Sequence, residues 1–372
     1  MPVFYFPVEG LELTQPWNIG SVTVYPADSP PPVLLPALRQ AQANSPAQAF
    51  AALLEAKDPP SKRALIEVPA QSKEIAWTTA SIALDVLRVY QHVGNEWLRV
   101  TEFGLPGQVR SFTVVYGQVQ DDERVGLGVW APGDATGWSF DDEQHKAWTQ
   151  SKAFQFVASA VGQDDTNEGQ RRALIGVELL SLAILELRPA AVVLNVVAAL
   201  EALLLEERPS SQTYTLAQRG AYFGCGRYEN SLCGRERDTC PFLGLDPSKE
   251  SERRQLKQSI ERTRSEPGWR CAEFLRIIDW YEDRSGIVHG KATRVPDRTA
   301  SRAEFWVMRW HIEAILEWIA DHPDDPVGDL ERAIRALPSP PDWEAIIAAE
   351  RAAEEASGAS YLPLKKSVAG DG

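Results

Sequence analysis

The feature that most constrains the fold is a change in residue pattern near Ser139. Before it, short runs rich in β-branched and aromatic residues alternate with Gly, Pro and Asn, as in Val3–Pro7, Leu11–Thr14 and Ser21–Tyr25. After it, apolar residues recur at helical spacing over longer segments. The pattern therefore predicts an α+β protein, in which an N-terminal mixed α/β module precedes an all-α helical bundle.

The length of 372 residues is more than one ordinary domain needs. We expect a β-rich recognition or regulatory module at 1–165 and a helical bundle at 166–322. The bundle contains an irregular, cysteine-containing insert at 225–248, rich in Gly and Pro. C-terminal helices and a flexible tail occupy 323–372.

The first module is expected to contain one long helix, Trp77–His92, whose apolar residues have helical spacing. Three β-rich runs follow it, at Trp97–Glu102, Ser111–Val119 and Arg124–Trp130. The short polar segment between the last two predicts a β-hairpin.

The helical part begins with a predicted helix from Ser139 to about Val161, for which Ser139 and Asp142 form a plausible cap. Pro189 suits the first turn of a later helix, where its missing N–H costs nothing. The further predicted helices are Arg171–Leu187, Pro189–Glu207, Thr213–Phe223, Lys249–Arg264, Trp269–His289, Thr299–Ala320, Val327–Leu337 and Trp343–Ala356.

The charge of the chain is unevenly distributed. Its net charge is −14, yet residues 208–310 contain 19 Lys and Arg against 14 Asp and Glu, a difference of +5. A local basic patch can bind a polyanion while the remaining surface repels nonspecific binding, although a solvated helical face explains the mixed charges of Lys249–Arg264 as well. The longest charge-free apolar stretch, Pro189–Leu200, is too short to cross a bilayer, and no secretory signal is visible. We therefore expect a cytoplasmic protein with no membrane partner.

Histidine is the usual residue for acid–base chemistry near neutral pH. His289 ends the segment YEDRSGIVHG, in which Arg284 lies five residues earlier and Gly290 follows directly. A glycine at that place indicates a helix C-terminus, so we expect His289 in the last turn, where the helix dipole stabilises imidazolium. Arginine supplies a forked cation that matches phosphate oxygens. The pair is a minimal metal-free set for attack of an RNA 2′-hydroxyl on its own phosphodiester.

The spacing of this pair raises a geometric question. On an ideal helix, five residues place Arg284 and His289 about 140° apart. They converge if the Arg side chain reaches round, if Ser285–Gly286 distorts the helix, or if a second copy completes the site. The predicted helix is apolar on two faces, which favours a homodimeric composite site. The apolar residues are Cys271, Phe274, Ile278 and Tyr281 on one face and Ile277, Trp280 and Ile287 on the other.

Three segments occur in a fixed order: AALEALLLEE, which contains Glu201, then LAQRGAYF, then RSGIVHG. In this order they resemble the HEPN superfamily, specifically its ApeA-like branch, over roughly 170–322. The resemblance implies a four- or five-helix up-and-down bundle, a homodimer with the active site at the helix interface, and metal-independent cleavage of RNA to 2′,3′-cyclic phosphate ends, in a defence or toxin role. No cofactor is implied for catalysis.

The resemblance also assigns residues. Arg284 and His289 match the family's catalytic pair, Ser285 its polar position after the Arg, and Glu201 its acidic residue in the ALEAL segment. Lys291 occupies the position where the toxin–antitoxin branch has a Tyr, so regulation by a nucleotidylated tyrosine is not expected.

Two other interpretations stay open. In the first, Arg284 forms a structural pair with Glu201 or Asp283, and His289 only caps its helix. The protein is then a noncatalytic dimeric sensor or scaffold that binds a ligand through its N-terminal module. In the second, the protein is a nucleotide-binding regulator. The segment Gly290–Thr293 resembles a fragment of a phosphate loop, but the G-x4-G-K spacing fails.

Four cysteines, Cys225, Cys233, Cys240 and Cys271, are candidates for a structural zinc site. A reducing cytoplasm favours thiolate–zinc binding over disulfides. The spacings lack the C-x2-C knuckle that marks a strong zinc motif, so inert thiols are the alternative.

Overall fold

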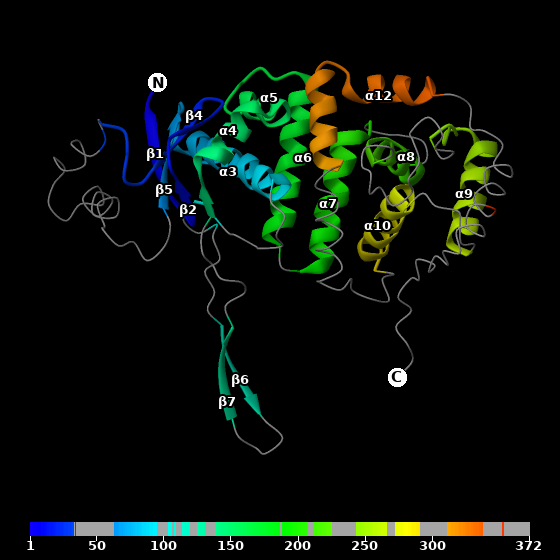
Figure 1. The fold of residues 1–372 in the computed structure, drawn as a ribbon, viewed down its shortest axis with the longest axis horizontal. Coiled ribbons are helices and arrows are strands. Elements are labelled where there is room, and N and C mark those ends of the chain that lie inside the picture. The colour runs from blue at the N-terminus through cyan, green and yellow to red at the C-terminus, as the bar shows by residue number, and fades with distance from the viewer. Residues whose placement is uncertain are drawn as a thin grey trace. The chain divides into compact units, whose positions relative to one another are not determined.

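The structure is a computed structural model, and it describes residues 1–32, 63–94, 103–105, 114–119, 125–130, 138–186, 188–206, 212–224, 243–265, 272–290 and 311–337, with the single positions 34, 108 and 352. The chain forms two compact units, residues 1–186 and 187–372 (Figure 1). A small antiparallel sheet near the N-terminus is followed by helices, so the α+β class predicted from the sequence is confirmed.

The sheet of the first unit has four antiparallel strands in the order β1-β5-β4-β3. These are β1 (Val3–Glu9), β5 (Arg63–Pro69), β4 (Val22–Pro26) and β3 (Trp17–Ile19). Burial alternates along β4, where Val22 and Val24 face the interior, as expected for a sheet with one covered face.

Two further strand pairs belong to the first unit. A short parallel pair joins β2 (Leu11–Leu13) to β8 (Trp138–Phe140). An antiparallel pair joins β6 (Val114–Val119) to β7 (Val125–Trp130), which confirms the predicted pairing of these segments. The predicted strand at Trp97–Glu102 lies outside the described residues.

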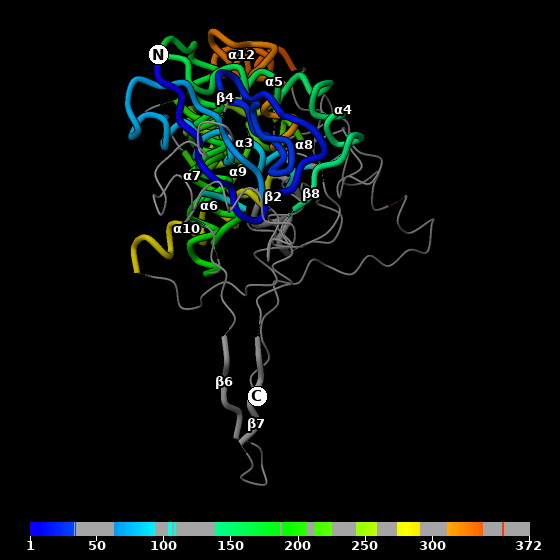
Figure 2. Tube along the Cα trace, turned by 90° about the vertical axis from the view of Figure 1, so that its left-hand side faces the viewer, coloured from blue at the N-terminus to red at the C-terminus, as the bar shows by residue number. Residues whose placement is uncertain are grey.

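Helix α3 (Lys73–Gly94) packs against β4 and β5 (Figure 2). It begins about one turn before the predicted Trp77. A cluster of aromatic side chains fills the space beside α3. Neighbouring rings in the cluster have centroids about 4.6–6.2 Å apart. The cluster consists of Trp17, Tyr90, Phe140, Trp148 and Phe154. These rings bury large apolar surfaces and dominate the core of this unit.

The predicted helix from Ser139 to Val161 is wrong in two respects. It begins with Asp141, whose carboxylate accepts a hydrogen bond from Gln144 N, and it is divided into α4 (Asp142–Gln150) and α5 (Lys152–Ser159). Ser151 lies between them with extended backbone, and its hydroxyl accepts a bond from Phe154 N. A serine that caps a new helix in this way ends the preceding one.

Helix α6 (Glu168–Leu185) packs against α3 and therefore belongs to the first unit, whereas the predicted boundary at 165 assigns it to the helical bundle. A buried polar network joins the two helices. Arg88 donates to Ser181 Oγ over 2.7 Å and to the carbonyl of Phe103, and it pairs with Asp85. Burial raises the pKa of Asp85, against the opposing effects of Arg88 and Ser181.

The second unit is helical among its described residues. Its helices are α7 (Pro189–Leu204), α8 (Gln212–Gly224), α9 (Glu250–Ser265), α10 (Ala272–Val288), a helix over residues 311–321, and α12 (Pro326–Arg335). Helix α10 packs against α7 and α8. Gly220 on α8 lets α10 approach closely, because a Cβ at this position would collide with Ile277.

The sequence predicted each of these helices, with Pro189 at the start of α7. The predicted segments 299–310 and 343–356 fall outside the described residues, apart from position 352, which is helical. Within the described part of the chain, none of the helices combines the length and the hydropathy needed to cross a membrane.

Candidate functional site

Helices α7 and α10 bring Glu201 and Arg284 together, although 83 residues separate them in the sequence. Arg284 Nη2 lies 3.4 Å from Glu201 Oε2. Their side chains are 30% and 22% exposed, so the pair lies at the edge of the helical core and still touches solvent. The sequence analysis named this contact as one of the two structural pairs open to Arg284.

Helix α7 positions Glu201 by burying the residues around it. Val197, Leu200 and Leu204 are each about 1% exposed, and they fix the rotation of α7 against the core. Burial raises the pKa of Glu201, and the positive charge of Arg284 partly opposes that effect. A carboxylate at this depth is therefore stabilised by a cation on the facing helix.

Tyr281 is a third member of the cluster, and sequence reasoning placed it only on an apolar face. The guanidinium carbon of Arg284 lies 5.6 Å from the centroid of the Tyr281 ring, within the range of a cation–π contact. The Tyr281 hydroxyl donates to Gln212 Oε1 over 3.0 Å, which ties the ring to α8. Burial and the nearby Glu201 carboxylate raise the pKa of Tyr281. The i, i+3 spacing of Tyr281 and Arg284 is the signal that could have indicated this contact.

His289 lies at the exposed C-terminal end of α10. Its backbone N–H donates to Ser285 O over 3.0 Å, and Gly290 N donates to Ile287 O over 3.2 Å. Gly290 has φ +62°, the left-handed conformation of a helix-ending glycine. The predicted place of His289 at the end of this helix is confirmed, and His289 is exposed.

The helix remains regular between Arg284 and His289. Helix α10 continues through Ser285 and Gly286, and Ser285 is half-buried. A distortion at Ser285–Gly286, one of the three ways in which the pair could converge, is therefore absent, and the angular separation of about 140° for five residues applies. Arg284 is directed to Glu201 of its own chain.

The apolar faces of α10 are mostly covered within the chain itself. Phe274, Ile277, Ile278 and Trp280, which come from both predicted faces, are between 0 and 4% exposed. Their apolar character therefore requires no second copy. Val288, directly before His289, is 55% exposed.

The cysteine site falls outside this description. Cys225, Cys233, Cys240 and Cys271 all lie outside the described residues, so zinc binding stays a prediction. The described ranges themselves contain no group of three or more His, Cys, Asp or Glu side chains arranged to bind a metal ion.

Comparisons of the chain with models of protein families, with curated proteins and with solved structures find no match.

Proposed function

We propose that the chain is a metal-independent endoribonuclease of HEPN type, with a HEPN-like bundle in its helical part. The observation that carries the proposal is the arrangement around Arg284. The guanidinium of Arg284 is held by Glu201 and Tyr281, and further along the same helix an exposed histidine, His289, lies at the end of α10. Such a pair combines a fixed cation with a proton-transfer group that a polymer can reach.

In this mechanism the RNA supplies its own nucleophile. His289 accepts the proton of the 2′-hydroxyl as its oxygen attacks the adjacent phosphorus, and the bond to the 5′-oxygen breaks. The imidazolium then returns a proton to that leaving oxygen, which leaves a 2′,3′-cyclic phosphate and a 5′-hydroxyl. Arg284 stabilises the negative charge that develops on the phosphoryl oxygens, and Glu201 and Tyr281 fix the position of its guanidinium. Ser285 is the polar neighbour in this assignment.

The regularity of α10 limits how Arg284 and His289 can reach the same phosphate. Arg284 is engaged within its own chain, about 140° around the helix from His289. We therefore propose a homodimer in which Arg284 of one copy and His289 of the other act on the same phosphate. The proposed partner is RNA, the proposed setting is the cytoplasm, and the proposed biological role is defence or toxicity.

The same ion pair also favours a second function. A guanidinium paired with Glu201 and packed on Tyr281 is satisfied without any ligand, as in a noncatalytic dimeric scaffold whose N-terminal module binds a ligand. The two functions differ in RNA turnover, so one assay separates them.

The test uses the full chain, a fluorescent single-stranded RNA and excess EDTA. We expect cleavage with 2′,3′-cyclic phosphate ends, and loss of at least 100-fold in rate for Arg284→Ala and His289→Ala at unchanged melting temperature. Arg332→Ala, whose side chain is 65% exposed on α12, is the matched control. Cleavage by both active-site variants at the parental rate would exclude the nuclease, and absence of turnover in the parent would favour the scaffold.

Complementation then tests the composite site. Arg284→Ala and His289→Ala chains are mixed, unfolded and refolded together, so that heterodimers form. In a shared site, the heterodimer contains one centre with both residues intact, so mixing restores activity that neither variant has alone. If both residues of a centre come from one chain, the mixture stays inactive.

A further inference from the structure

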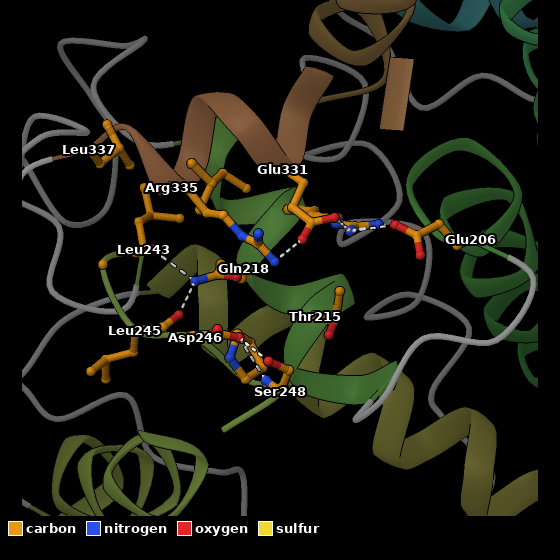
Figure 3. A pocket seen from close by; sticks show the side chains of 14 residues that line it. Glu206, Thr215, Gln218, Leu243, Leu245, Asp246, Ser248, Glu331, Arg335 and Leu337 are labelled. Atoms are coloured by element: carbon orange, nitrogen blue, oxygen red, sulfur yellow. Dashed lines mark hydrogen bonds and ion pairs between the residues drawn. The ribbon is translucent and has the colours of Figure 1, made fainter. Parts of the chain in front are cut away.

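A pocket in the second unit lies away from the candidate nuclease residues, and no function has been assigned to it above. It has a volume of about 230 Å³ and lies between α8, α12 and the turn at residues 243–248 (Figure 3). Gln218 reaches from α8 to the turn, where its amide donates to the carbonyls of Leu243 and Leu245. These bonds hold the turn over α8, so the described walls of the pocket are fixed by the fold.

Both arginines that line the pocket are already engaged. Arg219 is 5% exposed; Nη1 donates to Leu204 O over 2.7 Å, and Nη2 lies 3.2 Å from Glu206 and 3.5 Å from Glu331. Arg335 pairs with Glu331 one turn earlier on α12. At Arg219 an anionic ligand would have to displace these carboxylates from a buried guanidinium, which is costly, whereas the Arg335 side chain is 68% exposed.

The carboxylates of the pocket also have cationic partners, since Glu206 and Glu331 pair with Arg219 and Asp246 lies 3.7 Å from Lys249, but each keeps some exposed surface. Glu206 is 53% exposed, Glu331 35% and Asp246 30%. Although burial opposes ionisation, hydrogen bonds from Ser248 hold the pKa of Asp246 below its usual range. The lining contains three carboxylates and two arginines, so its formal charge is −1.

Another part of the lining is apolar. Leu243, Leu245, Ile334 and Leu337 contribute to the walls of the pocket, but Leu243, Leu245 and Ile334 are at most 7% exposed, so the apolar surface open to a short hydrocarbon segment is small. A ligand that matches both parts of the lining has a cationic end that donates hydrogen bonds and a small apolar body.

We infer that this pocket binds a small organic cation with an amino or guanidino group on a short aliphatic chain. Its nitrogen donors bind Glu206 and Asp246, and its chain packs against the leucines. The inference is independent of the proposed nuclease, since neither Arg284 nor His289 takes part. The pocket nevertheless lies close along the chain to the proposed nuclease site, because Leu204 and Glu206 follow Glu201 by about one turn at the end of α7.

Isothermal titration of the full chain with agmatine, which has both an amino and a guanidino group, tests the inference. The titration is done at 150 mM NaCl, which screens nonspecific attraction to a chain of net charge −14. We expect saturable 1:1 binding to each chain, weakened at least tenfold by Glu206→Gln. Glu206 is half exposed, so this variant is expected to fold. Asp246→Asn provides a second test on the turn.

The matched control is Glu250→Gln on α9, which removes the same charge from a side chain that is 75% exposed and does not line the pocket. Its affinity should equal that of the parent. Absence of saturable binding, equal weakening by Glu206→Gln and Glu250→Gln, or binding of inorganic phosphate in preference to agmatine would each overturn the inference. Because binding is measured directly, these outcomes say nothing about RNA cleavage, and an inactive nuclease leaves the inference standing.

Discussion

The guanidinium of Arg284 lies between two restraints, the Glu201 carboxylate 3.4 Å away and the Tyr281 ring with its centroid at 5.6 Å. One restraint comes from α7 and the other from the preceding turn of α10 itself. A long, flexible side chain that is restrained on two sides loses little further entropy when it binds a phosphate. This arrangement distinguishes Arg284 from an arginine that is free on a helix surface.

Substitution of Tyr281 tests whether this restraint matters for catalysis. Tyr281→Leu removes the ring beneath Arg284 and should lower kcat about fivefold, with KM nearly unchanged, because cation–π contacts of this kind contribute about 1 kcal/mol. Tyr281→Phe keeps the ring and loses the hydrogen bonds of the hydroxyl to Gln212 and Thr213, so its kcat should lie between those of the parent and of Tyr281→Leu. Steady-state cleavage of RNA measures both constants. A Tyr281→Leu variant with parental kcat, or one in which only KM changes, would contradict a positioning role.

Glu201 predicts a specific pH dependence of stability. Because burial raises its pKa above the usual 4.5, the folded state retains this proton at pH values where the unfolded chain has lost it. The contribution of Glu201 is thus fully present below 4.5 and falls as pH rises through the raised pKa. Glu201→Gln should lack this decrease. Urea unfolding of both proteins from pH 4 to 8 gives the difference in free energy, and a difference that is constant with pH would show that Glu201 titrates normally.

The network of Arg88 predicts a large effect on stability. Arg88→Met leaves the buried Asp85 without its cation, and loss of one partner of a buried pair costs about 3–5 kcal/mol. Arg171→Met is the control, because Arg171 pairs with Glu168 on the surface with its side chain 56% exposed, and such pairs contribute about 0–1 kcal/mol. Chemical denaturation measures both. Equal free energies of unfolding for the two variants would mean that the network contributes no more than a surface pair.

Two glycines with similar backbone angles should respond differently to substitution. Gly20 (φ +60°) and Gly290 (φ +62°) are both left-handed, which costs an alanine roughly 1–2 kcal/mol. A Cβ at Gly20 would also collide with the carbonyl oxygens of Ala158 and Val161, whereas none of the described residues lies within 4 Å of one at Gly290. Gly20→Ala should therefore lose about 1–3 kcal/mol more than Gly290→Ala in thermal or urea unfolding. Equal losses in the free energy of unfolding would show that the turn at Gly20 accommodates the added Cβ without further destabilisation.

Local patterns in the sequence were sufficient to predict most of the helices. The start of α7 at Pro189 and the end of α10 at Gly290 follow from backbone restrictions that act within a few residues. The break at Ser151 was missed because a serine inside an apolar periodic run is compatible with a continuous helix as well as with a cap. The boundary near 165 was placed too early because the contact of Ser181 with Arg88 is a long-range one.

Strand β5 shows the same limit for the sheet. Its apolar run Ala64–Ile66 pairs with β1 on one side and β4 on the other, and short apolar runs are ambiguous without their partners. In the candidate site, the sequence grouped Arg284, Glu201 and His289 through their order along the chain. The contact of Arg284 with Tyr281 and the ion pairs of Arg219 depend on how α7, α8 and α12 pack. The sequence of any one segment does not predict that packing.

Each compact unit is one uninterrupted stretch of chain, so a single covalent link near residue 187 joins them. A gene fusion or a crossover at this point would transfer either half whole, without dividing the strands of the sheet or separating α7 from α10. The architecture thus permits modular exchange, in which either half is inherited as a unit independently of the other.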